Sequence, residues 1–471
     1  MIEELKPYEA LRPSYDPWLG EIPKHWSQKR LWSISSPRVE RNPGNLPLLS
    51  VFLDRGVIPY GEGGGQVHAP SLDLSNYQVV HPGDFVLNNQ QAWRGSVGVS
   101  RHHGIISPAY IVLRLNGELL PAYANYLFRC LRLVDQFVAA SKGVGDIQRQ
   151  VFWPFLRRVT VPIPSTMEQE AIGRFLDHAN RHIDQFIRAK KKLIALLNEQ
   201  KQAIIHQAVT RGLDPNVKLK DSGVPWLRQI PAHWEIAKLK HNISTIEQGW
   251  SPQCDAQPVQ TFDEWAVLKV GCVNRDVFSP HQNKKLPLSL QPRPQLVVRM
   301  GDVLMSRANT PSLVGLAALV EQPYPRLMIS DKHYRFRGRP DRVDEQFLVL
   351  ALRSSPTRAQ IESATNGASS SMQNISQQLV GNLLVALPGL DEQRLIRAEV
   401  ASSTAGLRRV IASTEAGLAF VSEYRTRLIS DVVTGQLNVR AAALQPDVEE
   451  ELAPAEPSGD EDGDLDDHEA A

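Results

Sequence analysis

Polar side chains that can pair with nucleobases follow strand-like apolar runs at two places in this chain of 471 residues. Asn and Gln amides can each make two hydrogen bonds to adenine, and an Arg guanidinium can do the same with guanine, in the major groove of DNA. The candidates after the first run are Asn89, Gln90, Arg94, Lys142, Gln148, Arg149 and Gln150, and those after the second are Arg307, Asn309, Gln373 and Asn374. The same residue types also suit ordinary surface loops. As clusters, however, they favour a nucleic-acid interface.

A second group of basic residues is better suited to phosphates than to bases. Lys269, Arg275 and Lys332 stand apart from the amide-rich clusters. Phosphate contacts position a protein on nucleic acid without reading its sequence. We therefore expect these three side chains to fix the orientation of the second site rather than its base preference.

Sequence motifs for catalysis and metal binding are absent. The chain has no GxxxxGK[ST] phosphate loop and no HExxH metal motif. No Pro-Pro dipeptide occurs, which excludes the Asp/Asn-Pro-Pro-aromatic pocket that holds a flipped base in amino-methyltransferases. Cys130, Cys254 and Cys272 are scattered and form no CxxC pair. We expect a non-catalytic chain that binds no metal and no cofactor of its own.

Charge is distributed very unevenly along the sequence. Residues 441–471 contain twelve acidic residues and no Lys or Arg. The rest of the chain carries all 52 basic residues and 39 of the 51 acidic ones, a net charge of about +13. A basic body is typical of proteins that bind nucleic acid, whereas an acidic tail rich in Ala and Pro is expected to be disordered. The polar N-terminus and the lack of long apolar runs are typical of a soluble cytoplasmic protein.

The sequence contains an internal repeat. Residues 16–31 (DPWLGEIPKHWSQKRL) match residues 224–239 (VPWLRQIPAHWEIAKL) at eight of sixteen positions, including both tryptophans. Gly83-Asp84 recurs as Gly301-Asp302, and Pro164, Glu168 and Gln169 recur 224 residues later as Pro388, Glu392 and Gln393. An internal repeat of this size predicts two similar folded parts. The repeated His25 and His233 lie beside tryptophans, which favours a structural role over catalysis.

Each copy is followed by a long amphipathic segment. In the first, apolar residues from Ile172 to Ile204 recur with an average spacing of 3.5 residues, and the second repeats this pattern from Ile396 to Leu428. This spacing is typical of a coiled-coil helix. Ser165 and Thr166 are suitable N-caps ahead of Glu168 and Gln169. Each helix would be about 65 Å long and needs a partner, which we expect to be its own repeat.

The predicted fold class is α+β, with two sheet-containing domains in a pseudo-twofold repeat, separated by two long helices packed as an antiparallel coiled coil. The predicted parts are a first domain at 1–166, a first helix at 167–212, a hinge at 213–223, a second domain at 224–390, a second helix at 391–437 and an acidic disordered tail at 438–471.

The doubled PWLxxIPxHW motif, the Gly-Asp turn, the P-x-x-x-EQ helix entry and the alternation of globular and helical parts together resemble the specificity subunit of type I restriction-modification enzymes. The resemblance implies two target recognition domains, each reading one half of a bipartite DNA sequence. It also implies partners: double-stranded DNA, two methyltransferase subunits that use S-adenosylmethionine to modify adenine, and restriction subunits that cleave DNA with ATP and Mg. The acidic tail is not part of the family pattern.

Other interpretations of the sequence remain. Stretches like Trp93-Arg94-Gly95 and Arg307-Ala308-Asn309 recur in family members with different targets, which favours contacts with the DNA backbone or the scaffold at these positions. A coiled-coil scaffold with two protein-binding heads is the main alternative function, and a self-sufficient enzyme with disguised motifs is another. The basic body and the Gln/Asn/Arg loops disfavour the scaffold, because protein-binding surfaces favour aromatic and aliphatic anchors.

The acidic tail gives a first prediction. If it covers the basic body electrostatically, removal of residues 441–471 will strengthen non-specific binding to duplex DNA at low salt, since more phosphates can then release counterions. The measurement is a salt titration of DNA affinity for the full-length and truncated chains. Equal affinities at low salt would show that the tail is a bystander.

Overall fold

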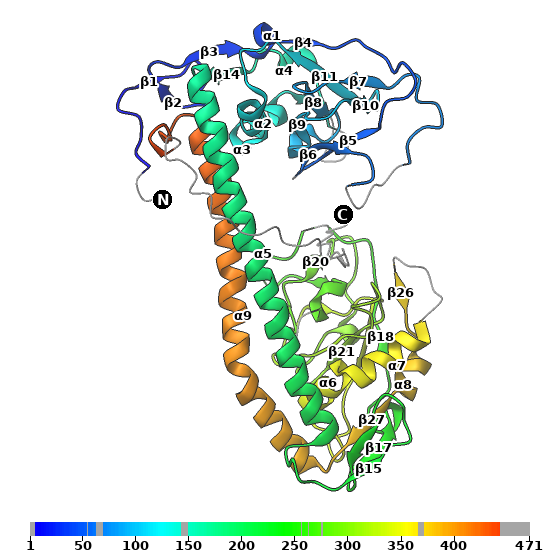
Figure 1. Cartoon of the computed structure of the whole chain (residues 1–471). Helices are drawn as coiled ribbons and strands as arrows, with labels where there is room; N and C mark the ends of the chain where they lie inside the picture. The colour runs from blue at the N-terminus through cyan, green and yellow to red at the C-terminus, as the bar shows by residue number, and fades with distance from the viewer. Residues whose placement is uncertain are drawn as a thin grey trace. The chain divides into compact units, whose positions relative to one another are not determined.

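The computed structural model describes residues 5–53, 55–62, 69–142, 149–255, 257–261, 263–274, 277–365 and 372–442. The chain divides into two compact units (Figure 1). Unit 1 contains residues up to Lys191 together with those from Glu415 to the end of the described chain, and unit 2 contains Lys192–Thr414.

Unit 1 combines short strands with short helices and parts of two long helices, the second being the end of α9 (Leu390–Val433). Its elements are β1 (Leu11–Pro13), β2 (Glu21–Pro23), β3 (Ser27–Arg30), α1 (Leu31–Ile34), β4 (Ser35–Pro37), β5 (Leu49–Phe52), β6 (Gly56–Pro59), β7 (Gln78–Val80), β8 (Phe85–Asn88), the 3-10 helix η1 (Ala92–Arg94), β9 (Val97–Val99), β10 (Gly104–Ile106), β11 (Tyr110–Leu115), α2 (Pro121–Arg129), α3 (Leu131–Ala139), β12 (Ser141–Lys142), β13 (Gln150–Val151), α4 (Trp153–Leu156), β14 (Thr160–Ile163) and the first part of α5 (Thr166–Arg211).

Unit 2 follows a similar order. Its elements are the rest of α5, β15 (Leu219–Asp221), β16 (Gln229–Pro231), β17 (Glu235–Lys238), η2 (Leu239–His241), β18 (Glu247–Gln248), β19 (Ala266–Leu268), η3 (Val270–Val273), β20 (Asn283–Lys285), η4 (Pro294–Leu296), β21 (Val303–Ser306), β22 (Ala308–Asn309), β23 (Ala317–Leu319), β24 (Leu327–Met328), β25 (His333–Phe336), α6 (Glu345–Arg353), α7 (Ser355–Thr365), β26 (Gln373–Asn374), α8 (Gln377–Asn382), β27 (Leu384–Leu387) and the first part of α9 (Leu390–Val433).

The central sheets of the two units have the same topology. Unit 1 has a four-stranded sheet in the order β4-β11-β8-β9, and unit 2 has one in the order β18-β25-β21-β23. All neighbours in both sheets are antiparallel. Gly83 and Gly301 precede β8 and β21 with φ of 88° and 87°, a left-handed conformation that favours glycine. The two copies of the sequence repeat therefore have the same central fold, and the predicted α+β class is confirmed.

The two long helices run antiparallel. In unit 1 the start of α5 (Ile172, Leu176) packs in one core with the end of α9 (Leu428, Val432). In unit 2 the end of α5 packs in one core with the start of α9. Apolar residues spaced by three and four positions supply these contacts, as the sequence predicts. Helix α9 ends at Val433 rather than at the expected position 437, because Gly435 adopts a φ of 79° and turns the chain.

The start of each long helix is tied to the repeated tryptophan motif through its glutamate. In unit 1, Glu168 accepts a 2.6 Å hydrogen bond from Tyr8 and lies 3.0 Å from His25 Nε2. In unit 2, Glu392 lies 2.9 Å from His233 Nε2 and accepts a 3.0 Å bond from the Trp234 indole. Each repeated histidine therefore contacts the glutamate at the start of the long helix in its own unit.

The adjacent glutamine makes the same three bonds in both units. Gln169 is buried; its Nε2 donates to the carbonyls of Glu118 and Pro164, and its Oε1 accepts from the Leu120 amide at 2.8 Å. Gln393 is buried and bonds the corresponding carbonyls of Arg342 and Pro388 and the Asp344 amide. Leu120 and Asp344 are the N-caps of α2 and α6. One side chain thus joins the start of the long helix to the start of a helix in the globular part.

Two segments of the predicted domain division contain ordered structure. The segment 213–223, expected to be a hinge, contains β15, which pairs with β16. The predicted tail starts too early, because Asn438 donates a 2.9 Å backbone bond to Lys6 and Val439 is buried in the core of unit 1. Residues 443–471 lie outside the described residues.

The buried glutamines give a second prediction. Gln169→Leu leaves one amide and two carbonyls without their partner inside unit 1, and buried polar groups without partners are costly. We expect a loss of about 3 kcal/mol in the free energy of unfolding, with Gln393→Leu acting in the same way on unit 2. Chemical denaturation followed by tryptophan fluorescence measures this loss.

Glu170→Ala and Arg394→Ala are matched controls, since these neighbours are exposed on the same helix turns. Substitutions at exposed positions usually change stability by less than about 0.5 kcal/mol. Unchanged denaturation midpoints in both glutamine variants would contradict the role given to this side chain.

Candidate nucleic-acid interface

In unit 1 the predicted residues come together at a hairpin beside the end of β8. Strands β12 and β13 pair so that Lys142 lies opposite Gln150, and both side chains are exposed. The Val151 amide donates a 3.1 Å hydrogen bond to the Asn89 carbonyl, which fixes the hairpin against the loop that follows β8. Gln90 is exposed on that loop. Gln148 lies outside the described residues.

Trp93 organises the guanidinium groups of this site. The Arg94 and Arg149 guanidiniums lie 4.8 and 5.6 Å from the centre of its ring, within the range of a cation–π contact. The indole nitrogen donates a 2.9 Å bond to the Gln90 carbonyl, which fixes the ring against η1. Because the ring is fixed, both guanidiniums are partly oriented before any ligand binds.

A second cation–aromatic cluster lies on the other strand of the hairpin and just after it. The Lys142 ammonium lies 4.7 Å from the centre of the Phe152 ring and 4.9 Å from that of Phe155. The two rings are 5.5 Å apart and tilted by 57°. Phe152 and Phe155 are not among the residues predicted from the sequence, although aromatic residues directly after Gln150 and Val151 were a usable signal.

In unit 2 the equivalent backbone bond is present. The Ile375 amide donates to the Arg307 carbonyl at 3.0 Å, which matches the Val151–Asn89 bond of unit 1. Ile375 is 224 residues after Val151, the same offset as in the surrounding repeat. Strands β22 and β26 then pair Ala308 with Asn374 and Asn309 with Gln373. In each unit, an equivalent segment is therefore held beside the end of an equivalent strand, β8 in unit 1 and β21 in unit 2.

The predicted amide side chains of unit 2 differ in their exposure to solvent. Asn309 is buried; its Nδ2 donates to Asn274 at 3.1 Å and its Oδ1 accepts from the Thr310 amide at 2.9 Å. Gln373 is also buried, whereas Asn374 is exposed. In this structure Asn374 is therefore the predicted amide whose side chain faces solvent.

The predicted cations of unit 2 lie on neighbouring segments. Arg307 is half-buried, and its guanidinium donates to the Asp331 carbonyl at 3.3 Å. Its amide donates to the Lys332 carbonyl at 2.7 Å, so Arg307 and Lys332 are held side by side. Lys269 is the N-cap of η3, a separate segment, and Arg275 lies outside the described residues.

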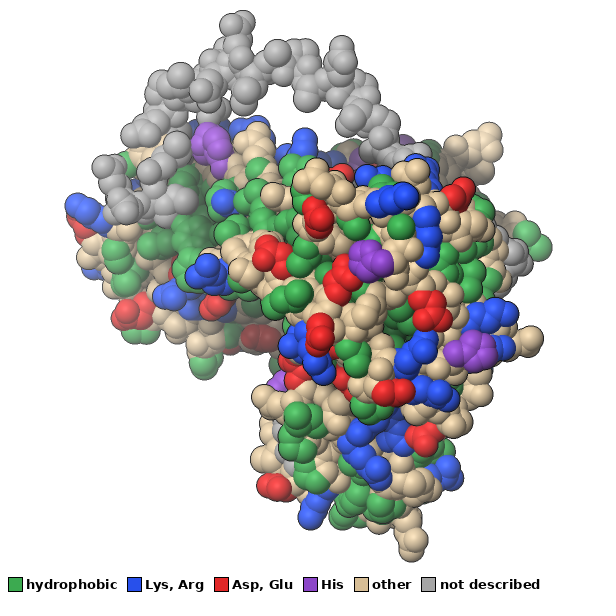
Figure 2. Space-filling view, turned by 90° about the horizontal axis from the view of Figure 1, so that it is seen from below, with side chains coloured by type: hydrophobic (Ala, Val, Ile, Leu, Met, Phe, Trp, Pro, Cys, Tyr) green, Lys and Arg blue, Asp and Glu red, His purple; other side chains and the backbone are tan. Residues whose placement is uncertain are grey.

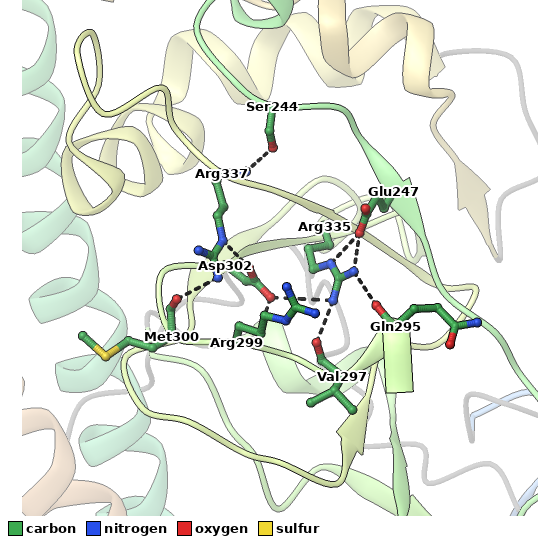
Figure 3. A network of polar contacts seen from close by, with 9 residues as sticks. All are labelled: Ser244, Glu247, Gln295, Val297, Arg299, Met300, Asp302, Arg335 and Arg337. Carbon is green, nitrogen blue, oxygen red and sulfur yellow. Dashed lines mark hydrogen bonds and ion pairs between the residues drawn. The ribbon is translucent and has the colours of Figure 1, made fainter. Parts of the chain in front are cut away.

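A network of polar contacts around the buried Asp302 carboxylate supports the strands that carry this site (Figure 3). Asp302, at the turn before β21, accepts from Arg337 Nε at 2.7 Å and from the Arg299 amide at 2.8 Å. Arg335 on β25 contacts Glu247 and donates to the Val297 and Gln295 carbonyls. In unit 1, Asp84 accepts both a 2.6 Å and a 2.9 Å bond from Arg38. Both Gly-Asp turns therefore hold an ion-paired carboxylate.

The surface carries charges of both signs. Figure 2 shows Lys and Arg side chains gathered over part of the face that it presents, with Asp and Glu among them. No group of three or more His, Cys, Asp or Glu side chains that could hold a metal ion occurs within the described ranges. In the same part of the chain, no helix is both long and apolar enough to cross a membrane.

A buried histidine lies directly behind the second site. His333 Nε2 lies 3.2 Å from the Cys272 sulfur, and its Nδ1 lies 2.8 Å from the Ser330 hydroxyl. Burial lowers the pKa of His333 to about 4, although its contact with the Val270 backbone and the charge of Asp331 both act in the opposite direction. Burial also raises the pKa of the Cys272 thiol, so both side chains are neutral at pH 7.

The third prediction concerns pH. In the unfolded chain His333 binds a proton near pH 6.5, but in the folded chain only near pH 4, so the unfolded state takes up more protons between these values. Unit 2 should therefore lose stability as pH falls from about 6.5 to 4, by up to about 3 kcal/mol from this residue.

His333→Gln keeps a polar side chain at this position but cannot titrate. Its stability should depend less on pH over this interval than that of the wild type, measured by denaturant unfolding at several pH values. The same pH dependence in both proteins would exclude His333 as its source.

Comparison with known proteins agrees with the sequence motifs, although no protein-family model matches the chain. The type I restriction enzyme EcoEI specificity subunit of Escherichia coli is 32% identical over 197 residues, which is 42% of this chain and 33% of that protein. A chain from a structural study of assembly and conformational transition in the type I R-M system superposes with a TM-score of 0.57 at 16% identity, covering 88% of this chain and 98% of that chain. The HsdS subunit of Thermoanaerobacter tengcongensis, 18% identical with the same coverage, gives a TM-score of 0.41. The chain thus shares its fold with the type I R-M structure, and the resemblance to type I specificity subunits that the sequence suggests is confirmed.

Proposed function

We propose that this chain is the sequence-specific DNA-binding specificity subunit of a type I restriction-modification complex. The observation that carries the proposal is the repeated backbone bond, Val151 to Asn89 and Ile375 to Arg307, which fixes an equivalent polar segment at the same strand end in both units. The similarity to a curated specificity subunit supports it. In this proposal each unit reads one half-site, that is, one half of a bipartite target.

Base reading is assigned to the exposed and cationic side chains of each segment. In unit 1 these are Gln90, Arg94, Arg149 and Gln150, and in unit 2 they are Arg307 and Asn374. Lys142, Lys269 and Lys332 are suited to phosphate contacts, together with Arg275. Gln148, which lies outside the described residues, stays a predicted reader, and the buried Asn309 and Gln373 are assigned to holding the segment.

The chain itself does no chemistry in this proposal. It directs two methyltransferase subunits, which use S-adenosylmethionine to methylate adenine, and restriction subunits, which cleave DNA with ATP and Mg. The described core clusters each lie within one unit, so each unit can complete its own core. Independent reading of the two half-sites follows.

A coiled-coil scaffold with two protein-binding heads remains the alternative. A gel-shift experiment with duplex DNA, with and without a methyltransferase partner, separates the two functions. A specificity subunit shifts DNA that carries its target in preference to scrambled DNA. A scaffold binds neither duplex selectively.

The fourth prediction tests independent reading. Arg149→Ala with Gln150→Ala should weaken recognition of one half-site, and Asn374→Ala should weaken recognition of the other, by about 1–3 kcal/mol for each base that the variant no longer reads. The measurement is the sequence around modified adenines in cells that carry each variant.

Glu170→Ala and Arg394→Ala are exposed controls that should leave both half-sites unchanged, because they lie on the long helices. A variant that relaxed both half-sites together would mean that the two units form a single composite reading surface, and independent reading would be wrong.

A further inference from the structure

Two phenylalanines are exposed on unit 1 next to the candidate interface. Phe152 and Phe155 are 44% and 40% exposed, one before and one within the short helix α4. The Phe152 amide donates a 3.0 Å bond to the Ala140 carbonyl, which ties the start of α4 to the base of the β12–β13 hairpin. The two rings lie 5.5 Å apart, so they form one exposed aromatic pair rather than two isolated side chains.

The fold does not require aromatic residues at these positions. At the repeat offset of 224 residues, unit 2 has Ser376 in place of Phe152 and half-buried Leu379 in place of Phe155. The residue after Phe155, Leu156, is buried, and its counterpart Val380 is buried as well. The core-facing position is therefore kept in both units, whereas the outward-facing aromatic pair is a feature of unit 1.

The surroundings of the pair favour nucleic acid over an apolar protein partner. The Lys142 ammonium lies within 5 Å of both ring centres, so the patch carries a positive charge at its centre. Lys142 is paired with Gln150, one of the proposed base-reading residues, and Arg149 is stacked on Trp93 next to it. A base can stack on an aromatic ring of this patch. The phosphate of the same nucleotide can pair with the Lys142 ammonium or with the nearby guanidiniums.

We propose that Phe152, Phe155 and Lys142 form an aromatic platform that stacks on a nucleobase at an opened base step of the first half-site. This inference rests on the proposed function. Apolar side chains can insert at a base step and offset the disrupted base stacking with contacts of their own. Lys142 then pairs with the adjacent phosphate. Unit 2 has no such platform at the equivalent position, so the two half-sites are engaged by different physical means.

The test uses a variant that copies unit 2. Phe152→Ser with Phe155→Leu introduces the residues found at the equivalent positions, which the fold already accommodates. The full chain is titrated with a duplex that carries both half-sequences, as identified from modified adenines. Base–aromatic stacking corresponds to about 5- to 150-fold in affinity per base, so we expect a loss in this range for the double variant.

A second readout locates the stacked base. 2-Aminopurine is placed at each purine position of the duplex in turn, and its emission is recorded on binding. Wild-type protein should change the emission at one step of the first half-site, and the double variant should not. Leu131→Ala, which removes a side chain 58% exposed elsewhere on unit 1, is the control and should behave as wild type.

The outcomes separate the platform from the proposed function. Wild-type affinity and an unchanged emission profile in the double variant would overturn the platform, as would an emission change confined to the second half-site. A variant that binds DNA normally but no longer assembles with methyltransferase would mark the patch as a protein contact and overturn it too. Failure of the wild type itself to prefer the target duplex would instead refute the proposed function.

Discussion

In both units a buried glutamine side chain joins three segments that are far apart in sequence. Gln169 and Gln393 each bond the residue that caps a helix of the globular part, a carbonyl just before it and the proline before the long helix. Such a side chain is satisfied only when all three segments are in place, so the long helix cannot change its start without exposing unpaired backbone groups. The adjacent glutamate adds the tryptophan motif to the same junction. Position and direction of the long helix are thereby fixed relative to the sheet within each unit.

The two units use different residues to provide partners for equivalent carboxylates. Both need a partner for the carboxylate of the Gly-Asp turn, since a buried carboxylate without one is very costly. Unit 1 supplies Arg38, next to the edge strand β4, whereas unit 2 supplies Arg337, next to the end of β25. In unit 1 Tyr8 bonds Glu168, and in unit 2 the Trp234 indole bonds Glu392. Both units therefore provide a partner for each carboxylate, but the partner residue differs between the units.

The sequence was sufficient to predict the features that depend on periodicity and repetition, which are the long helices, their pairing with each other and the doubled domain. The antiparallel direction of that pairing was implied by the family resemblance. The sequence did not reveal which polar residues face solvent. Asn309 and Gln373 are of residue types that can pair with bases, but their side chains are buried, because the pairing of β22 with β26 places them in the interior. Phe152 and Phe155 look like core residues in a sequence and are exposed, since the adjacent Leu156 is the one that enters the core. Burial of this kind is decided by tertiary pairing, which composition does not encode.

These differences follow one physical rule. The Gly-Asp turn before the central strand and the Glu-Gln pair at the start of the long helix are the same in both copies, because their backbone conformation and their bonds leave little freedom for substitution. Side chains that point to solvent from the same backbone positions carry no such constraint; the exposed Gln150 of unit 1 corresponds to the exposed Asn374 of unit 2 at the repeat offset. A backbone bond between an amide and a carbonyl, as from Val151 to Asn89 and from Ile375 to Arg307, does not depend on side-chain identity. A scaffold that fixes the segment through its backbone can present different side chains from equivalent positions, which suits the two-part recognition proposed for this chain.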